Sequence, residues 1–182
     1  MRVYDFWTHG TSVQIEDPDK VQYIRRWGYG TTIRQEHETW NWFHFAIPTP
    51  TIIDNINTQY GVVYLKARTG NQGIQSDPRE AFISEIGFID VDKIEPNYQL
   101  GSVPTLGENC SAETFGISKK LLYKQPKNGL VICVRVEFKP VPSTTYPPHA
   151  VGEITFVGAG ARFKVKDAPI KKNDKLNDKL QC

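Results

Sequence analysis

The segment Leu130–Lys139, with the sequence LVICVRVEFK, carries the pattern that decides the fold. Every second position from its first residue is apolar, and the positions between them include Arg135 and Glu137. Side chains alternate between the two faces of a strand, so this pattern is typical of a strand with one side against a core. The dipeptide Asn128-Gly129 directly before it predicts a hairpin turn that joins it to residues Lys119–Tyr123.

Similar short runs of β-branched and aromatic residues recur along the chain, separated by turn residues, and no long helical periodicity interrupts them. The pattern predicts about nine strands. They are expected at Val3–Thr8, Ser12–Glu16, Val21–Trp27, Thr31–Gln35, Trp40–Ile47, Gly61–Arg68, Phe82–Val91, Leu130–Lys139 and Glu153–Lys166. This arrangement predicts an all-β fold, an antiparallel β-sandwich of jelly-roll type, with a barrel as the alternative. A helix is expected only as a short turn around Ser76–Ala81.

The last predicted strand is interrupted by Gly158-Ala159-Gly160. Ile154 and Phe156 precede the interruption in one register, whereas Phe163 and Val165 follow it in the other. We therefore expect a bulge or a sharp bend that returns both sets of apolar side chains to the same face.

The 182 residues suit one domain, expected at residues 1–166 and followed by a charged, flexible tail at residues 167–182. Residues 92–118 and 140–149 are rich in glycine or proline and are expected to be long irregular connections. The net charge of +2, from 22 basic and 20 acidic side chains, predicts no strong attraction to nucleic acid or a membrane surface. The three cysteines lack the spacing of a zinc or redox motif, and without a signal peptide they favour reduced thiols and a cytoplasmic location.

The most informative candidate for function is the predicted strand at Trp40–Ile47. Its alternation places Trp40, Trp42 and His44 on one face and leaves an apolar set for the core on the other. An indole ring suits sugar rings, aromatic ligands or cations, and imidazole can transfer a proton near neutral pH. The alternative is that both faces of this sheet are covered and the two tryptophans only pack under a loop.

Two further segments could complete such a site. Trp7 and His9 share one face of the first predicted strand with Asp5, although Asp5 and His9 lie about 13 Å apart along an extended strand and cannot touch unless the strand bends. Tyr146 and His149 occupy a proline-rich loop that would hold them in place over the Trp40 face.

These patterns support three classes of function. The leading hypothesis is that the protein binds a small ligand, a glycan or a hydrophobic metabolite, through Trp7, Trp40, Trp42, His44, Tyr146 and His149. The second is a cofactor-independent isomerase or cyclase of specialised metabolism, in which His44 or His9 moves a proton. The third is a structural or interaction module whose tryptophans belong to the core.

No motif in the sequence identifies a cofactor or a metal. The sequence contains no Gly-x-Ser-x-Gly elbow, no phosphate-binding loop and no pair of histidines at the spacing of a local metal site. Arg25-Arg26 beside Trp27 and Tyr29 could stack a base, but a two-residue basic cluster is common. We therefore expect neither a cofactor nor a metal, and no nucleic-acid partner.

Four segments in the first seventy residues are distinctive: Trp7–Gln14 (WTHGTSVQ), Gly28–Thr31 (GYGT), Asn41–Pro50 (NWFHFAIPTP) and Arg68–Gly70 (RTG). In these segments the chain resembles a family of small uncharacterised microbial proteins. No activity is attached to the family, so the resemblance implies no catalytic residue. It does place the distinctive residues of the family where the Trp and His side chains lie.

Overall fold

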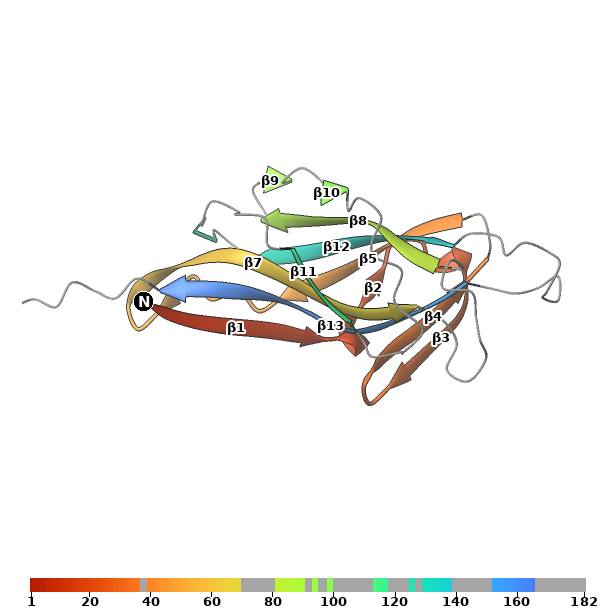
Figure 1. The fold of residues 1–182 in the computed structure, drawn as a ribbon, viewed down its shortest axis with the longest axis horizontal. Coiled ribbons are helices and arrows are strands. Elements are labelled where there is room, and N and C mark those ends of the chain that lie inside the picture. The colour runs from red at the N-terminus through yellow and green to blue at the C-terminus, as the bar shows by residue number, and fades with distance from the viewer. Residues whose placement is uncertain are drawn as a thin grey trace, which may run out of the picture.

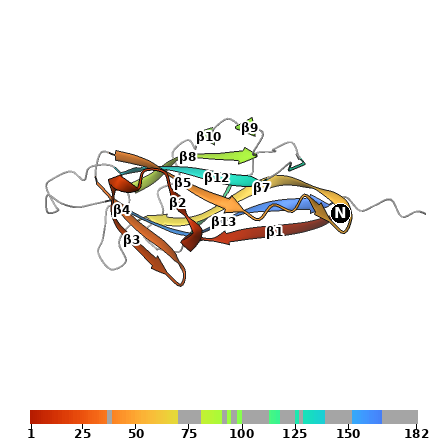
Figure 2. The same cartoon turned by 180° about the vertical axis from the view of Figure 1, so that it is seen from behind.

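Two antiparallel β-sheets lie face to face in this protein (Figures 1 and 2). The computed structural model describes residues 1–36, 39–69, 81–90, 93–94, 98–99, 113–117, 125–126, 129–138 and 152–165. Its elements are β1 (Arg2–His9), the 3-10 turn η1 (Gly10–Ser12), β2 (Gln14–Ile15), the 3-10 turn η2 (Pro18–Lys20), β3 (Val21–Trp27), β4 (Gly30–Gln35), β5 (Thr39–Ile47), β6 (Ile52–Ile53), β7 (Ile56–Thr69), β8 (Ala81–Asp90), β9 (Lys93–Ile94), β10 (Tyr98–Gln99), β11 (Glu113–Ile117), β12 (Leu130–Phe138) and β13 (Gly152–Val165). No helix in these ranges is long and apolar enough to cross a membrane.

The strand order is that of a jelly roll. One sheet has the order β11-β7-β13-β4-β3, with β1 also paired to β13, and the other has the order β10-β8-β12-β5-β2. In consequence β4 pairs with β13, β5 with β12, β7 with β11 and β8 with β10, so early strands pair with late ones as in a folded-over hairpin. This nesting of two Greek keys confirms the predicted sandwich, and the separation of the strands into two sheets decides against the barrel. We call them the β13 sheet and the β12 sheet.

The predicted bulge in the last strand is confirmed. The register of β13 against β7 shifts between Phe156 and Gly158. Ile154 and Phe156 before the shift, and Phe163 and Val165 after it, are all fully buried. The extra residue at the shift therefore returns both apolar sets to the core, as the two glycines allow.

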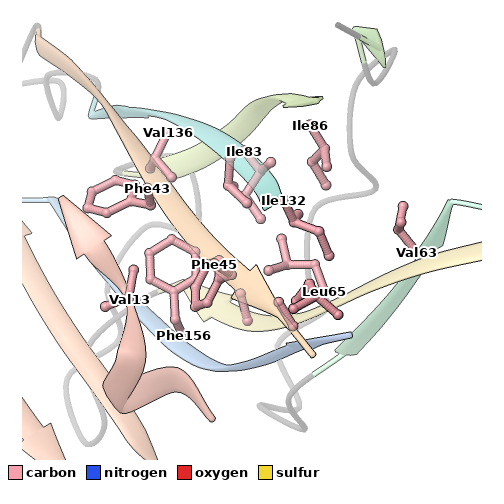
Figure 3. Close-up of a cluster of buried hydrophobic side chains, with 14 of the residues drawn as sticks. Val13, Phe43, Phe45, Val63, Leu65, Ile83, Ile86, Ile132, Val136 and Phe156 are labelled. Carbon is pink, nitrogen blue, oxygen red and sulfur yellow. The ribbon is translucent and has the colours of Figure 1, made fainter. Parts of the chain in front are cut away.

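Aromatic side chains join the two sheets at the centre of the core (Figure 3). The ring of Phe156, on β13, lies 5.0 Å from the ring of Phe43 and 5.4 Å from that of Phe45, both on β5. All three side chains are completely buried. The alternation predicted for Trp40–Ile47 is thus correct on its apolar side.

Three backbone segments meet at the bulge, where β13 changes its partner from β4 to β1. A Cβ atom on Gly10 would lie 2.0 Å from the carbonyl oxygen of Phe156, and one on Gly30 would lie 2.2 Å from the same oxygen. A side chain at either position would overlap this backbone.

Three expectations for the strands are wrong. Of Ser12–Glu16, only Gln14-Ile15 is a strand (β2), and Ser12 ends the 3-10 turn η1, where its hydroxyl donates a hydrogen bond to the His9 carbonyl at 2.7 Å. The range 92–118 contains the short strands β9, β10 and β11. The strand expected from Gly61 begins at Ile56, after a two-residue turn at Asp54-Asn55 in which both residues have positive φ.

Four other expectations lie outside the described residues. They concern the helical turn near residue 77, the proline-rich loop at 140–149, the tail at 167–182 and the first strand of the hairpin that ends at Asn128-Gly129.

Candidate functional site

The structure places the predicted aromatic residues on the outer faces of the two different sheets. Trp7 and His9 lie on β1 in the β13 sheet, while Trp40, Trp42 and His44 lie on β5 in the β12 sheet. These two groups therefore do not come together in one site, contrary to the prediction that Trp7 and His9 complete the Trp40 face. Tyr146 and His149 lie outside the described residues.

Trp7 is held flat against the β13 sheet. It pairs with Gly160, where a Cβ atom would lie 2.7 Å from the indole ring, so the absence of a side chain makes room for the ring. On the other side of Gly160, Tyr64 of β7 places its ring nearly parallel to the indole, with centroids 5.4 Å apart and planes 14° apart. The indole is nevertheless 44% exposed. This is a fixed and accessible aromatic surface.

A pocket of about 260 Å³ opens beside this ring and is lined by Trp7, Thr8, His9, Lys66, Val157 and Gly158. His9 Nδ1 accepts a hydrogen bond from the Thr11 backbone N–H at 3.2 Å. The proton of a neutral ring must then sit on Nε2, which has no partner among the described residues. The pocket can therefore offer a ligand an imidazole donor and the Lys66 ammonium beside the indole.

An ion pair supports the aromatic pair from the neighbouring row of the sheet. Arg162 donates two hydrogen bonds to the Asp5 carboxylate, at 2.7 and 2.8 Å, and its guanidinium lies 5.4 Å from the centre of the Tyr64 ring. The hydrogen bond from Arg162 lowers the pKa of Asp5. Burial, together with the charge of Asp5, raises the pKa of the Tyr64 phenol, which stays neutral at physiological pH. The Asp5 carboxylate therefore pairs with Arg162, and it does not orient the His9 ring.

On the β12 sheet, Trp40 and Trp42 lie on the outer face and not in the core. Trp40 is 40% exposed and Trp42 is partly buried. The Trp40 ring is already approached by two cations of the protein itself, with Lys20 Nζ at 4.6 Å and Arg135 Cζ at 4.8 Å from its centre. A ligand that stacks on this ring would have to displace at least one of them.

His44 lies in a chain of three hydrogen-bonding side chains on this face. It is directly opposite Cys133 of β12, and its Nδ1 is 3.2 Å from Cys133 Sγ, while its Nε2 is 3.0 Å from Glu16 Oε2. Burial raises the pKa of the Cys133 thiol to about 11, and the charge of Glu16 adds to the shift. The protonated thiol therefore donates to Nδ1, and the ring N–H at Nε2 donates to Glu16.

The position of Glu16 is set by the backbone. Its N–H donates to the Trp42 carbonyl at 3.0 Å. The next residue, Asp17, exchanges backbone hydrogen bonds with the fully buried Asn41 side chain, at 3.1 and 2.9 Å. These contacts fix the segment after β2 against β5, so that the Glu16 carboxylate faces His44.

Sequence reasoning missed four residues that contribute to these two faces: Glu16, Tyr64, Lys66 and Cys133. Cys133 lies 89 residues from His44 in the chain, and only the register of β12 against β5 brings the two together. The one local signal was the alternation itself, which puts Cys133 and Arg135 on the polar face of β12. Within the described residues, no group of three His, Cys, Asp or Glu side chains is arranged to hold a metal ion.

A model of a family of unknown function (DUF6623) matches residues 1–81. This match is consistent with the resemblance to an uncharacterised family, and it spans the chain from β1 to the start of β8. It therefore includes Trp7, His9, Gly10, Gly30 and His44, but not β12 or β13. No curated protein matches the chain.

Proposed function

We propose that this protein binds a small ligand, a glycan or a hydrophobic metabolite, on the outer face of the β13 sheet, with Trp7 as its stacking surface. The observation that carries the proposal is the half-exposed indole held flat over Gly160 beside a pocket. A ring held in place in the free protein loses little conformational freedom when a ligand stacks on it. His9 and Lys66 supply hydrogen-bond donors at the same pocket, which suits hydroxyl or carboxylate groups on the ligand.

The β13 face is favoured over the β12 face for a physical reason. The Trp40 ring is approached by Lys20 and Arg135, whereas the ring stacked with Trp7 is that of the neutral Tyr64, and Trp7 also lines the pocket. A ligand at Trp7 therefore does not have to break an existing cation–π contact.

The test compares two matched tryptophan variants in a thermal-shift and calorimetry screen of oligosaccharides and hydrophobic metabolites. A ligand at about a hundred times its Kd stabilises the folded protein by about 2.7 kcal/mol. We expect Trp7→Ala to weaken binding at least about tenfold. Trp40→Ala, which removes an equally exposed indole from the other sheet, should leave the affinity unchanged.

Unfolding midpoints of both variants, and the milder Trp7→Phe, separate lost binding from lost folding. A panel in which nothing binds the folded wild-type protein would contradict the proposal. Binding that is lost in Trp40→Ala and kept in Trp7→Ala would move the site to the β12 sheet.

The Cys133–His44–Glu16 chain favours a second candidate, an enzyme in which His44 transfers a proton. A base that hydrogen-bonds a potential nucleophile and is oriented by a third group is a common arrangement in catalytic sites. Here the buried thiol is protonated at neutral pH, so His44 is the group that can exchange a proton and Cys133 positions it. This arrangement suits an isomerase or cyclase, in which a proton moves on the substrate and no covalent intermediate is needed.

The raised pKa of Cys133 gives a direct test of this arrangement. In a Cys110→Ser/Cys182→Ser background, we expect alkylation by iodoacetamide to be slow at pH 7 and to accelerate toward a midpoint at about pH 11. Glu16→Gln removes a negative charge that opposes thiolate formation, so it should shift the midpoint to lower pH. Glu137→Gln, on the same strand as Cys133, is the matched control and should not shift it. Rapid alkylation at pH 7 would show that the thiol is not held as described.

A further inference from the structure

A second pair of stacked aromatic rings lies on the same outer face as Trp7. Trp27 and Tyr29 have ring centroids 5.8 Å apart and planes 11° apart. Trp27 Nε1 donates a hydrogen bond to Thr32 Oγ1 at 3.1 Å, and Thr32 in turn bonds Thr155 of β13 at 2.9 Å. Both threonines point away from the core, because their neighbours Ile33 and Ile154 are fully buried inside it. The second pair therefore covers the β13 sheet on the side that carries Trp7.

The register gives the spacing of the two pairs along the sheet. Trp7 is opposite Gly160 of β13. Trp27 is opposite Gly30 of β4, and the next residue of β4, Thr31, is opposite Phe156 of β13. The two tryptophans are thus separated by about three residues along β13, on the order of 10 Å. The pocket with His9, Lys66 and Gly158 occupies the row between them. We call these two aromatic pairs and the pocket, which follow one another along β13 on the same face, the track.

Cations accompany the aromatic rings along this track. Arg25 lies 3.5 Å from the centre of the Trp27 ring, and Arg68 lies 5.0 Å from that of Tyr29. Two other cations of this face are neutralised, because Arg162 pairs with Asp5 and Arg34 with Glu153. In the part of the chain that the structure describes, neither Arg25 nor Lys66 has an acidic partner. The track therefore carries positive charge that a bound anion would balance.

We infer that the ligand is an acidic oligosaccharide that spans both aromatic pairs, with a carboxylate or sulfate at Lys66 and another near Arg25. This inference rests on the proposed binding function and narrows it to one ligand class. A sugar ring can stack on Trp7, whereas the Trp27 ring is already contacted by Tyr29 and by the Arg25 guanidinium, so the second pair contributes its cation. Sparse acidic groups match Arg25 and Lys66, neither of which has an acidic partner among the described residues. A nucleic acid, with a phosphate at every nucleotide, would require a denser row of cations than the track provides.

The test uses matched acidic and neutral ligands. The first pair is trigalacturonic acid and its methyl ester, and the second is a sulfated trisaccharide of galactose and its desulfated form. In at least one pair we expect the acid to bind about tenfold more tightly than its neutral partner at low salt, with the difference shrinking as salt is raised.

Variants that remove one positive charge each show which cations cause the tighter binding of the acidic ligand. Lys66→Gln and Arg25→Gln should each weaken binding of the acid about three- to tenfold and leave the neutral partner unaffected. Lys20→Gln, which removes a cation from beside Trp40 on the other sheet, is the control and should change neither.

Each outcome decides one of the two proposals. Equal binding of the acid and its neutral partner in both pairs, with Trp7→Ala weakening all of them, would overturn the inference and leave the proposed function intact. Tighter binding of oligothymidylate than of either acid would overturn it in favour of a nucleic acid. No binding by any of these probes would overturn the inference, and no binding in the wider screen of oligosaccharides and hydrophobic metabolites would reject the proposed function itself.

Discussion

Gly10→Ala is expected to lower the free energy of unfolding by about 3 kcal/mol or more. The new methyl group would lie 2.0 Å from the carbonyl oxygen of Phe156 and 2.6 Å from its carbonyl carbon, and both atoms belong to the backbone of β13. No rotation of a side chain relieves such an overlap, so η1 or β13 must shift. Gly30→Ala meets the same oxygen at 2.2 Å and should have a comparable effect. Urea unfolding followed by tryptophan fluorescence measures both.

Gly28→Ala is the matched control for these two variants. It lies in the turn between β3 and β4, two residues from Gly30, and a Cβ atom there would have nothing within 4 Å. We expect its free energy of unfolding to stay within about 0.5 kcal/mol of the wild type. Equal losses for all three variants would mean that general loop flexibility, and not the contact with Phe156, decides stability at these positions.

Phe156→Ala is expected to cost about 3–5 kcal/mol of stability. Its ring is completely buried and contacts Phe43 and Phe45 of the opposite sheet, so its removal leaves a cavity between the two layers (Figure 3). Phe156→Leu keeps most of the volume and should lose clearly less. Tyr23→Ala, which removes an aromatic ring that is 37% exposed on β3, is the control and should cost little. A loss for Phe156→Ala no larger than for Tyr23→Ala would contradict the central position of this ring.

The sequence predicted the faces of the strands well, because the two-residue period of a strand is a local property. The alternation in Trp40–Ile47 correctly separated Phe43 and Phe45 from Trp40 and Trp42, and the Gly158–Gly160 interruption correctly predicted a bulge. The turn before β7 also had a local signal that was not used, since Asp54-Asn55 are residues that tolerate positive φ.

The candidate site could not be predicted in the same way, because it depends on which strands are neighbours. Trp7 meets Tyr64 only through β13, which pairs with both of their strands, and His44 meets Cys133 only through the register of β5 against β12. Grouping Trp7 with Trp40 because both are tryptophans near a histidine therefore placed residues of two opposite sheets in one site. A sequence without an alignment of relatives contains no signal for these pairings.

The pairing of β1 and β4 with β13 has a consequence for synthesis of the chain. Of the strands within residues 1–81, β1, β4, β5 and β7 each require at least one partner that is made later, and β13 is the last strand described. Neither sheet can be completed while the ribosome is still translating the first half, and contacts between such distant residues form slowly. The nascent chain thus exposes the apolar faces of β5 and β7 until β12 and β13 emerge, and exposed apolar strand faces of this kind are prone to aggregation.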